Sequence, residues 1–134
     1  MDIVSNFRGD TVSDSFPIVK LATITRFLTW ILAIIFDKLI DDHEYSTELF
    51  LQNSQIKFFV QPLMRWDALF FIDIAQRGYE FSKNHAFFPG YPLIIRCFSP
   101  LFQVLGFNQT NSTILGALCI SNLCFVVAAW VLYK

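Results

Sequence analysis

Two long apolar runs constrain the fold of this chain more than any other feature. Residues 18–36 and 113–133 contain few charged side chains. A helix over the first run would span about 28 Å at about 1.5 Å per residue, which matches the ~30 Å hydrocarbon core of a bilayer. The second run is at least as long. These runs predict an all-α membrane protein.

The distribution of charge agrees with that class. Charged residues make up 16% of the 134-residue chain and hydrophobic residues 54%, whereas about a quarter of a soluble domain is charged. Every Asp and Glu lies at or before Glu80. The only charged side chains in the last 54 residues are therefore Lys83, Arg96 and Lys134. The net charge of −1 argues against nucleic acid, which requires a basic face. We therefore expect membrane lipid as a partner and no nucleic acid.

Five segments follow from this pattern. They are a polar cytosolic segment over 1–16, a transmembrane helix over 17–36, a luminal loop over 37–90, a kinked membrane helix over 91–107, and a transmembrane helix over 113–133. Lys20 and Arg26 lie in the first half of the first span, which favours a cytosolic N-terminal end. The prediction is therefore a polytopic protein with two to three transmembrane helices.

The segment over 91–107 contains a proline, and the three cysteines lie in apolar segments. Pro100 would kink a helix interior, so the segment either crosses the membrane as a kinked helix or lies partly within the interface. The cysteines have no CxxC spacing and stand in apolar surroundings, so we expect them to be buried thiols that act as small hydrophobes. They are Cys97, Cys119 and Cys124.

The loop carries the most informative motif, from Arg65 to Leu93. Asp67 stands beside Trp66 at the head of a helix expected over 65–77, with Gly78 as its terminator. On a helical wheel Asp67 shares a face with Phe71, and burial of that kind raises a carboxyl pKa toward the range useful for proton transfer. From the residues alone, Asp67 is either a general base or an N-cap or interfacial carboxylate beside a Trp anchor. We interpret the helix as re-entrant or interfacial.

Other side chains of the motif also allow two interpretations. Trp66, Phe87 and Phe88 either stack on a sugar face or seat the loop at the headgroup level. His85 either holds a substrate oxygen or is merely solvated. Arg26 in the first span either binds a lipid phosphate or snorkels to the interface.

Three local features complete the pattern. Asp73 and Arg77 have the spacing and order of a helical ion pair, and Gly90 between two prolines is expected to supply a turn. The run Asp41-Asp42-His43-Glu44 offers ligand atoms, but adjacent loop residues rarely all face one ion, so we predict no metal site.

The motif resembles the PIG-V family of GPI mannosyltransferases. The resemblance rests on Arg65-Trp66-Asp67-Ala68, Ile74-Ala75 with Gly78-Tyr79, and Ala86-Phe87-Phe88-Pro89-Gly90 with Pro92-Leu93. Arg26, the acid-His cluster Asp41-Asp42-His43, and Ser121-Asn122 are also similar to that family's N-terminal region. The resemblance runs from about Ile18 to the end of the chain.

The resemblance implies a GT-C type glycosyltransferase of the endoplasmic reticulum membrane. It would transfer mannose from dolichyl-phosphate mannose, on the luminal side, to a GPI glycolipid as the second, α1,6-linked mannose, without a cofactor. Asp67 would be catalytic, and Trp66, His85, Phe87, Phe88 and Arg26 would bind substrate. An accessory membrane subunit is a further expected partner.

Length separates this chain from the family. Members of the family are several times longer, so we expect the chain to correspond to their N-terminal portion. Two alternatives therefore stay open. One is a non-catalytic membrane protein that binds a partner or lipid, and the other is a different dolichyl-phosphate-dependent transferase.

Overall fold

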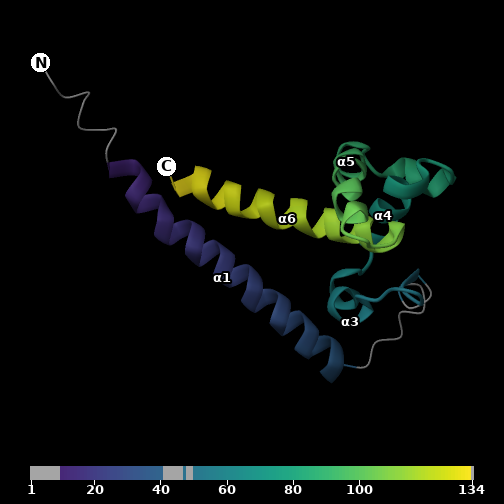
Figure 1. Cartoon of the computed structure of the whole chain (residues 1–134), viewed down its shortest axis with the longest axis horizontal. Coiled ribbons are helices and arrows are strands. Elements are labelled where there is room, and N and C mark those ends of the chain that lie inside the picture. Colours follow the sequence, from purple (N-terminus) through teal and green to yellow (C-terminus); the bar gives the residue numbers. More distant parts are fainter. Residues whose placement is uncertain (1–9, 41–46, 48–49, 134) are drawn as a thin grey trace, which may run out of the picture. The chain divides into compact units, whose positions relative to one another are not determined.

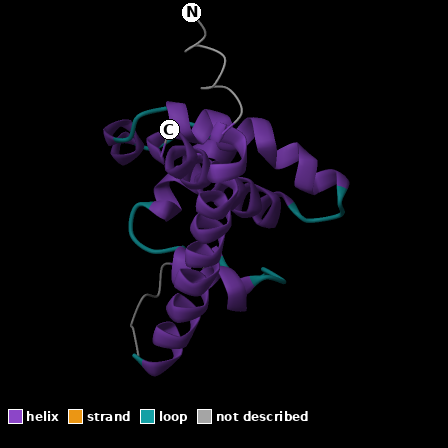
Figure 2. Ribbon diagram, turned by 90° about the vertical axis from the view of Figure 1, so that its left-hand side faces the viewer, coloured by secondary structure: helices purple, strands orange, loops and turns teal. Residues whose placement is uncertain are grey.

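A computed structural model describes residues 10–40, 47 and 50–133, and these residues form helices and loops with no strand among them (Figure 2). This confirms the all-α prediction. The elements in chain order are α1 (Asp10–Leu39), α3 (Lys57–Val60), η1 (Gln61–Leu63), α4 (Ala68–Arg77), η2 (Ser82–Ala86), α5 (Gly90–Val104) and α6 (Gln109–Tyr133). The run Asp41-Asp42-His43-Glu44 lies outside the described residues.

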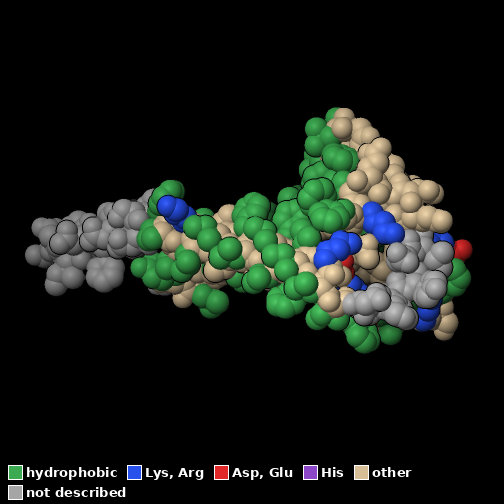
Figure 3. Space-filling model, turned by 90° about the horizontal axis from the view of Figure 1, so that it is seen from below, with side chains coloured by type: hydrophobic (Ala, Val, Ile, Leu, Met, Phe, Trp, Pro, Cys, Tyr) green, Lys and Arg blue, Asp and Glu red, His purple; other side chains and the backbone are tan. Residues whose placement is uncertain are grey.

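The two predicted spans are long helices. Phe16–Leu39 within α1 and all 25 residues of α6 are long and apolar enough to cross a membrane. Hydrophobic side chains make up much of the surface drawn in Figure 3, among other side chains and backbone. Helix α1 begins at Asp10, seven residues before the expected start of the span at residue 17. The difference arises because hydropathy locates the apolar span, whereas the helix continues into the polar residues that precede it.

The chain divides into two compact units. The first comprises Met1–Leu32 with Ser121–Lys134, and the second comprises Ala33–Ile120. In the first unit the Arg26 guanidinium lies over the ring of Phe125, 3.7 Å from its centroid. All the loop residues singled out above belong to the second unit.

The core of the second unit lies among α4, α5, the first half of α6 and the segment from Leu51 to Met64, which includes α3. Figure 1 shows α4 and α5 beside the start of α6. The backbones of α5 and α6 approach closely at Gly116, where a Cβ atom would lie 3.5 Å from the Ile95 carbonyl oxygen. Small residues permit this approach between membrane helices. The buried cluster consists of Leu51, Val60, Met64, Ile72, Ala75, Ile95, Ile114, Ala117 and Ile120.

Helix α5 is shorter than the segment predicted over 91–107. Its 15 residues, with Pro100 inside, extend about 22 Å, and transmembrane helices usually need about 17–25 residues. Its length therefore favours the interfacial alternative over a complete crossing.

The prediction of buried cysteines is wrong. All three thiols are free and exposed. They lie on apolar helices, where an exposed side chain faces whatever surrounds the helix, so an apolar neighbourhood in sequence did not imply burial within the chain.

Candidate active site

The turn before α4 delivers Trp66 to the surface. Trp66 has φ 51°, in the left-handed region that bulky side chains rarely adopt, and such a conformation costs about 1–3 kcal/mol. Its side chain is 81% exposed. Because Trp66 breaks the helical path, α4 begins at Ala68 rather than at residue 65 as predicted.

Two contacts hold the chain on the N-terminal side of this turn. Arg65 donates from Nη2 to Oδ1 of Asp37, and the two side chains are only 21% and 6% exposed. The Thr47 hydroxyl donates to the Met64 carbonyl oxygen at 2.9 Å. The ion pair ties the end of α1 to the residue that precedes Trp66. The sequence analysis missed Asp37, although its position directly after the first apolar run was a signal.

Asp67 follows at the N-cap position of α4, and its side chain is exposed. The predicted burial among apolar neighbours is therefore wrong, because the buried residues of α4 begin only one turn later, at Ile72. The capping alternative is not observed either, since the carboxylate makes no side-chain cap hydrogen bond. No described residue pairs with the carboxylate. Its oxygen atoms are thus accessible at the surface of the second unit.

The two phenylalanines of the Phe-Phe-Pro motif differ in their surroundings. The Phe87 ring stacks on Phe70 at 5.0 Å and meets the ring of Phe71 edge-on at 5.2 Å. The Phe87 carbonyl oxygen also accepts a 2.7 Å hydrogen bond from the Tyr79 hydroxyl. Phe88, in contrast, is 80% exposed. The structure places Phe87 in the packing of the loop against α4 and leaves Phe88 accessible.

The predicted Asp73–Arg77 ion pair is confirmed, with a distance of 2.8 Å between Oδ1 and Nε. Asp73 also accepts a 3.2 Å hydrogen bond from Nδ2 of Asn84, which is fully buried in η2. This carboxylate therefore fastens the loop after α4 to the helix. It is fully engaged in structure, unlike Asp67.

His85 and Gly90 lie at the two ends of the Phe-Phe-Pro motif. His85 is exposed, with its ring 5.2 Å from that of Tyr79 and Nδ1 3.3 Å from the Phe81 carbonyl oxygen. Within the described residues, no hydrogen bond joins it to Asp67. Gly90 is the first residue of α5; a Cβ atom there would lie 2.9 Å from the Phe88 ring. Gly90 lies within the helix and has no positive φ, so the predicted turn conformation is not observed.

Arg26 belongs to the first unit, whereas Asp67 belongs to the second. Its buried Nε atom has no hydrogen-bond partner among the described residues. Binding of a lipid phosphate by Arg26 stays a prediction. The described residues contain no cluster of three or more metal-ligating side chains.

Comparisons with known proteins give a consistent result. The profile of the family described as Mannosyltransferase (PIG-V) matches residues 15–134. The protein named GPI alpha-1,6-mannosyltransferase 2 from Rattus norvegicus is 33% identical over 120 residues, and that from Homo sapiens is 30% identical over the same length. Each alignment covers 84% of this chain. GPI mannosyltransferase 2 of Cryptococcus neoformans is 34% identical over 76 residues, which cover 54% of this chain and 18% of that protein.

The matched region spans 24% of the length of the rat and human relatives. No solved structure gives a significant match. The family match covers nearly the whole chain and includes both apolar helices and the Trp-Asp turn. The chain belongs to the PIG-V family of mannosyltransferases.

Proposed function

We propose that this chain carries the acceptor-activating site of a GPI mannosyltransferase. The donor would be dolichyl-phosphate mannose, the acceptor a GPI glycolipid in the lumen of the endoplasmic reticulum, and the product the second, α1,6-linked mannose. The observation that carries the proposal is the exposed Asp67 carboxylate. It stands at the head of α4 with no partner among the described residues, directly after a left-handed Trp66.

The chemistry requires one base. Transfer from a β-linked phosphate donor to an α-linked product inverts the anomeric carbon, which calls for a base on the face opposite the leaving group. Asp67 would accept the proton of the acceptor hydroxyl while that oxygen bonds to C1 of mannose. The bond from C1 to the phosphate oxygen breaks, and dolichyl phosphate departs with the electron pair. A positioned base of this kind contributes about 10²–10⁴-fold to a rate.

Exposed aromatic side chains would position the sugars. Trp66 and Phe88 are more than three-quarters exposed, so either ring is available to stack on a sugar face, whereas Phe87 is occupied by packing. His85, exposed beside Tyr79, would hold a sugar hydroxyl. Arg26 would bind the phosphate of the donor lipid. An accessory membrane subunit would bind the chain itself.

The test is complementation of cells that lack this mannosyltransferase. Because the match spans 24% of the human relative, we would express the chain alone and also a chimera in which residues 15–134 replace the matching part of that relative. Surface GPI-anchored proteins would be counted by flow cytometry, and GPI intermediates identified by mass spectrometry. We expect the chimera to restore surface expression and its Asp67→Asn variant not to.

Each outcome separates two of the possible functions. A chimera that rescues equally well with Asp67→Asn would exclude Asp67 as the base. Accumulation of a glycolipid other than the singly mannosylated one would indicate a different dolichyl-phosphate-dependent transferase. Rescue by the chimera but not by the stably inserted chain would show that the chain alone is a non-catalytic membrane protein.

A further inference from the structure

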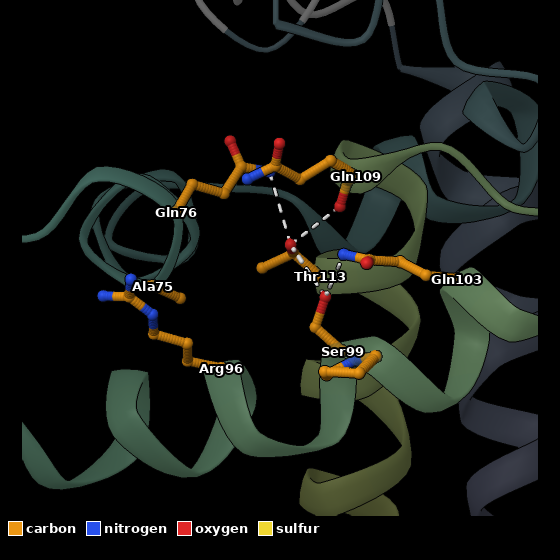
Figure 4. A pocket seen from close by; sticks show the side chains of 8 residues that line it. Ala75, Gln76, Arg96, Ser99, Gln103, Gln109 and Thr113 are labelled. Atoms are coloured by element: carbon orange, nitrogen blue, oxygen red, sulfur yellow. Dashed lines mark hydrogen bonds between the residues drawn. The ribbon is translucent and has the colours of Figure 1, made fainter.

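A polar cavity lies in the second unit, among α4, α5 and the start of α6. Its volume is about 220 Å³. Figure 4 shows side chains from α4, α5 and the start of α6 converging on it. None of the residues assigned to catalysis lines it. The lining residues are Ala75, Gln76, Arg96, Ser99, Pro100, Gln103, Gln109 and Thr113.

Hydroxyl and amide groups form the wall of the cavity. The Thr113 hydroxyl donates to the Gln109 carbonyl oxygen at 2.8 Å, so its oxygen is left to accept from Ser99 at 3.4 Å and from Gln76 at 3.4 Å. Gln103 in turn donates to Ser99 at 3.5 Å. Good hydrogen bonds to oxygen measure about 2.7–3.2 Å. The three bonds that face the cavity are long, so a ligand with hydroxyl groups could replace them without loss.

Ser99 and Thr113 are buried, at 4% and 2% exposure. Two hydroxyl groups on facing membrane-type helices, at the floor of an open cavity, need a reason to be there. They bond to each other across the two helices, as Ser and Thr often do between membrane helices. The same oxygen atoms line the cavity, so they can also bind a polar occupant.

Arg96 supplies the only formal charge in the wall. Its guanidinium forms no ion pair or hydrogen bond with any described residue, and no acidic side chain lines the cavity. In Figure 4 the side chain rises from α5 toward α4, on the same side of the helix as Ser99. Arg96 is exposed on α5, and a guanidinium without an acidic partner beside neutral hydrogen-bonding groups favours an anion.

We infer that this cavity binds a phosphate ester that carries a polyol ring, such as the head group of a phosphoglycolipid. Arg96 would hold the phosphate, since guanidinium matches phosphate geometry. Gln103, Ser99 and Thr113 would bind ring hydroxyls. The volume is below the roughly 300–1,000 Å³ of sites for drug-sized ligands, which suits a head group and excludes a whole glycan.

The biological reason for such a site rests on the proposed function. Both the phosphatidylinositol part of a GPI acceptor and dolichyl-phosphate mannose present this chemistry. The alternative is that Arg96 merely snorkels toward any anionic phospholipid. The two ideas differ in whether the ring hydroxyls matter.

The experiment measures lipid binding and not mannose transfer. A failure to bind lipid would therefore leave the role of Asp67 untouched, and lipid binding could be observed even if the chain transfers no mannose. The full chain would be equilibrated in detergent with equal amounts of phosphatidylinositol, dolichyl-phosphate mannose and phosphatidylserine. Retained lipid would be counted by native mass spectrometry. Phosphatidylserine carries the same phosphate diester without a ring, so it is the matched control lipid.

We expect one of the two ring-bearing lipids to be retained about tenfold more than phosphatidylserine, and the preferred one identifies the source. Arg96→Gln should lower its retention about tenfold, the loss of one charge-assisted contact of about 1.4 kcal/mol. Lys83→Gln, which removes an exposed cation that does not line the cavity, should leave lipid retention unchanged. Gln103→Leu should reduce the preference for the ring-bearing lipid over phosphatidylserine, because a contact with a ring hydroxyl is lost. The contact between Arg96 and the phosphate should remain.

Three results would overturn the inference. They are equal retention of phosphatidylserine, no effect of Arg96→Gln, and equal losses from Arg96→Gln and Lys83→Gln. Should Arg96→Gln lose its helical circular dichroism, Gln103→Leu decides the question, because Gln103 is exposed and its replacement leaves the buried hydroxyls in place. Inorganic phosphate and myo-inositol 1-phosphate would also be compared as competitors of lipid binding. Equal competition by the two would show that the ring does not contribute to binding.

Discussion

Asp67 and Asp73 are two carboxylates on one short helix with opposite surroundings. Asp67 is exposed and makes no cap hydrogen bond, whereas Asp73 holds Arg77 and Asn84. The sequence placed Asp67 at the head of the helix and predicted the Asp73 ion pair. It could not show that Asp67 is unburied, because a helical wheel gives the face of a residue and not what packs against it.

Replacing each aspartate by asparagine should therefore affect mannose transfer at position 67 and stability at position 73. In the rescuing chimera, Asp67→Asn should lower mannose transfer by at least about 100-fold with little change in thermal stability. Asp73→Asn should lower stability by about 1 kcal/mol and leave transfer measurable. Transfer in microsomes and melting in detergent would check both; a loss of transfer in Asp73→Asn alone would reverse the roles.

The Asp37–Arg65 pair supports the Trp66 turn from a distance of 28 positions in sequence. Arg65→Gln would leave the nearly buried Asp37 carboxylate without this partner, and we expect a loss of roughly 1–3 kcal/mol of stability. The charge-reversed double variant Asp37→Arg with Arg65→Asp should recover part of it. Melting in detergent checks this, with Lys20→Gln, which removes an exposed cation, as the control. Additive losses in the double variant would show that the pair contributes nothing.

For the helices, sequence signals within a few residues predicted the end of α4 correctly. The sequence contained no signal for contacts between residues that are distant in the chain. Gly78 ends α4 as predicted, with φ 82°. The start of α4 was misplaced because no propensity predicts a left-handed Trp66. The cavity beside Arg96 was not foreseen, since its walls come from three helices and a single apolar segment with one arginine does not reveal what faces it.

Two glycines provide a comparison of backbone and packing effects. Gly78 combines φ 82° with ψ −158° and open space around a future Cβ atom, so Gly78→Ala should cost about 1–3 kcal/mol through backbone strain alone. At Gly116 a Cβ atom would make ordinary contacts of 3.5 Å or more. Gly116→Ala should therefore be neutral, or stabilising by up to about 1 kcal/mol from helix propensity. Chemical denaturation in detergent would measure both, and a larger loss at Gly116 would contradict the close but permissive packing described here.

For the whole molecule, composition and hydropathy were sufficient for the class and for both long helices. They could not place α5, whose 15 residues fall short of a usual span. The position of α5 can be measured with the native cysteines, since a water-soluble reagent does not reach a thiol that is surrounded by lipid.

We expect Cys124, in the middle of α6, to resist a water-soluble maleimide in intact membranes and to react after denaturation. Cys97, beside Arg96 on α5, should react without denaturation if α5 lies at the interface, as its length favours. Single-cysteine variants would be labelled, with Ser82→Cys, at an exposed position of η2, as the reactive control. Protection of Cys97 equal to that of Cys124 would place α5 fully within the membrane.

The contact between Arg26 and Phe125 has a consequence for biogenesis. Roughly 100 residues must be translated after Arg26 before its aromatic partner exists, which takes about 5–20 s at ordinary elongation rates. Throughout that interval the first helix carries a guanidinium without the ring that later covers it. The nascent chain therefore has a period in which a translocon or insertase must shelter one cation, and replacing Phe125 would prolong that period indefinitely.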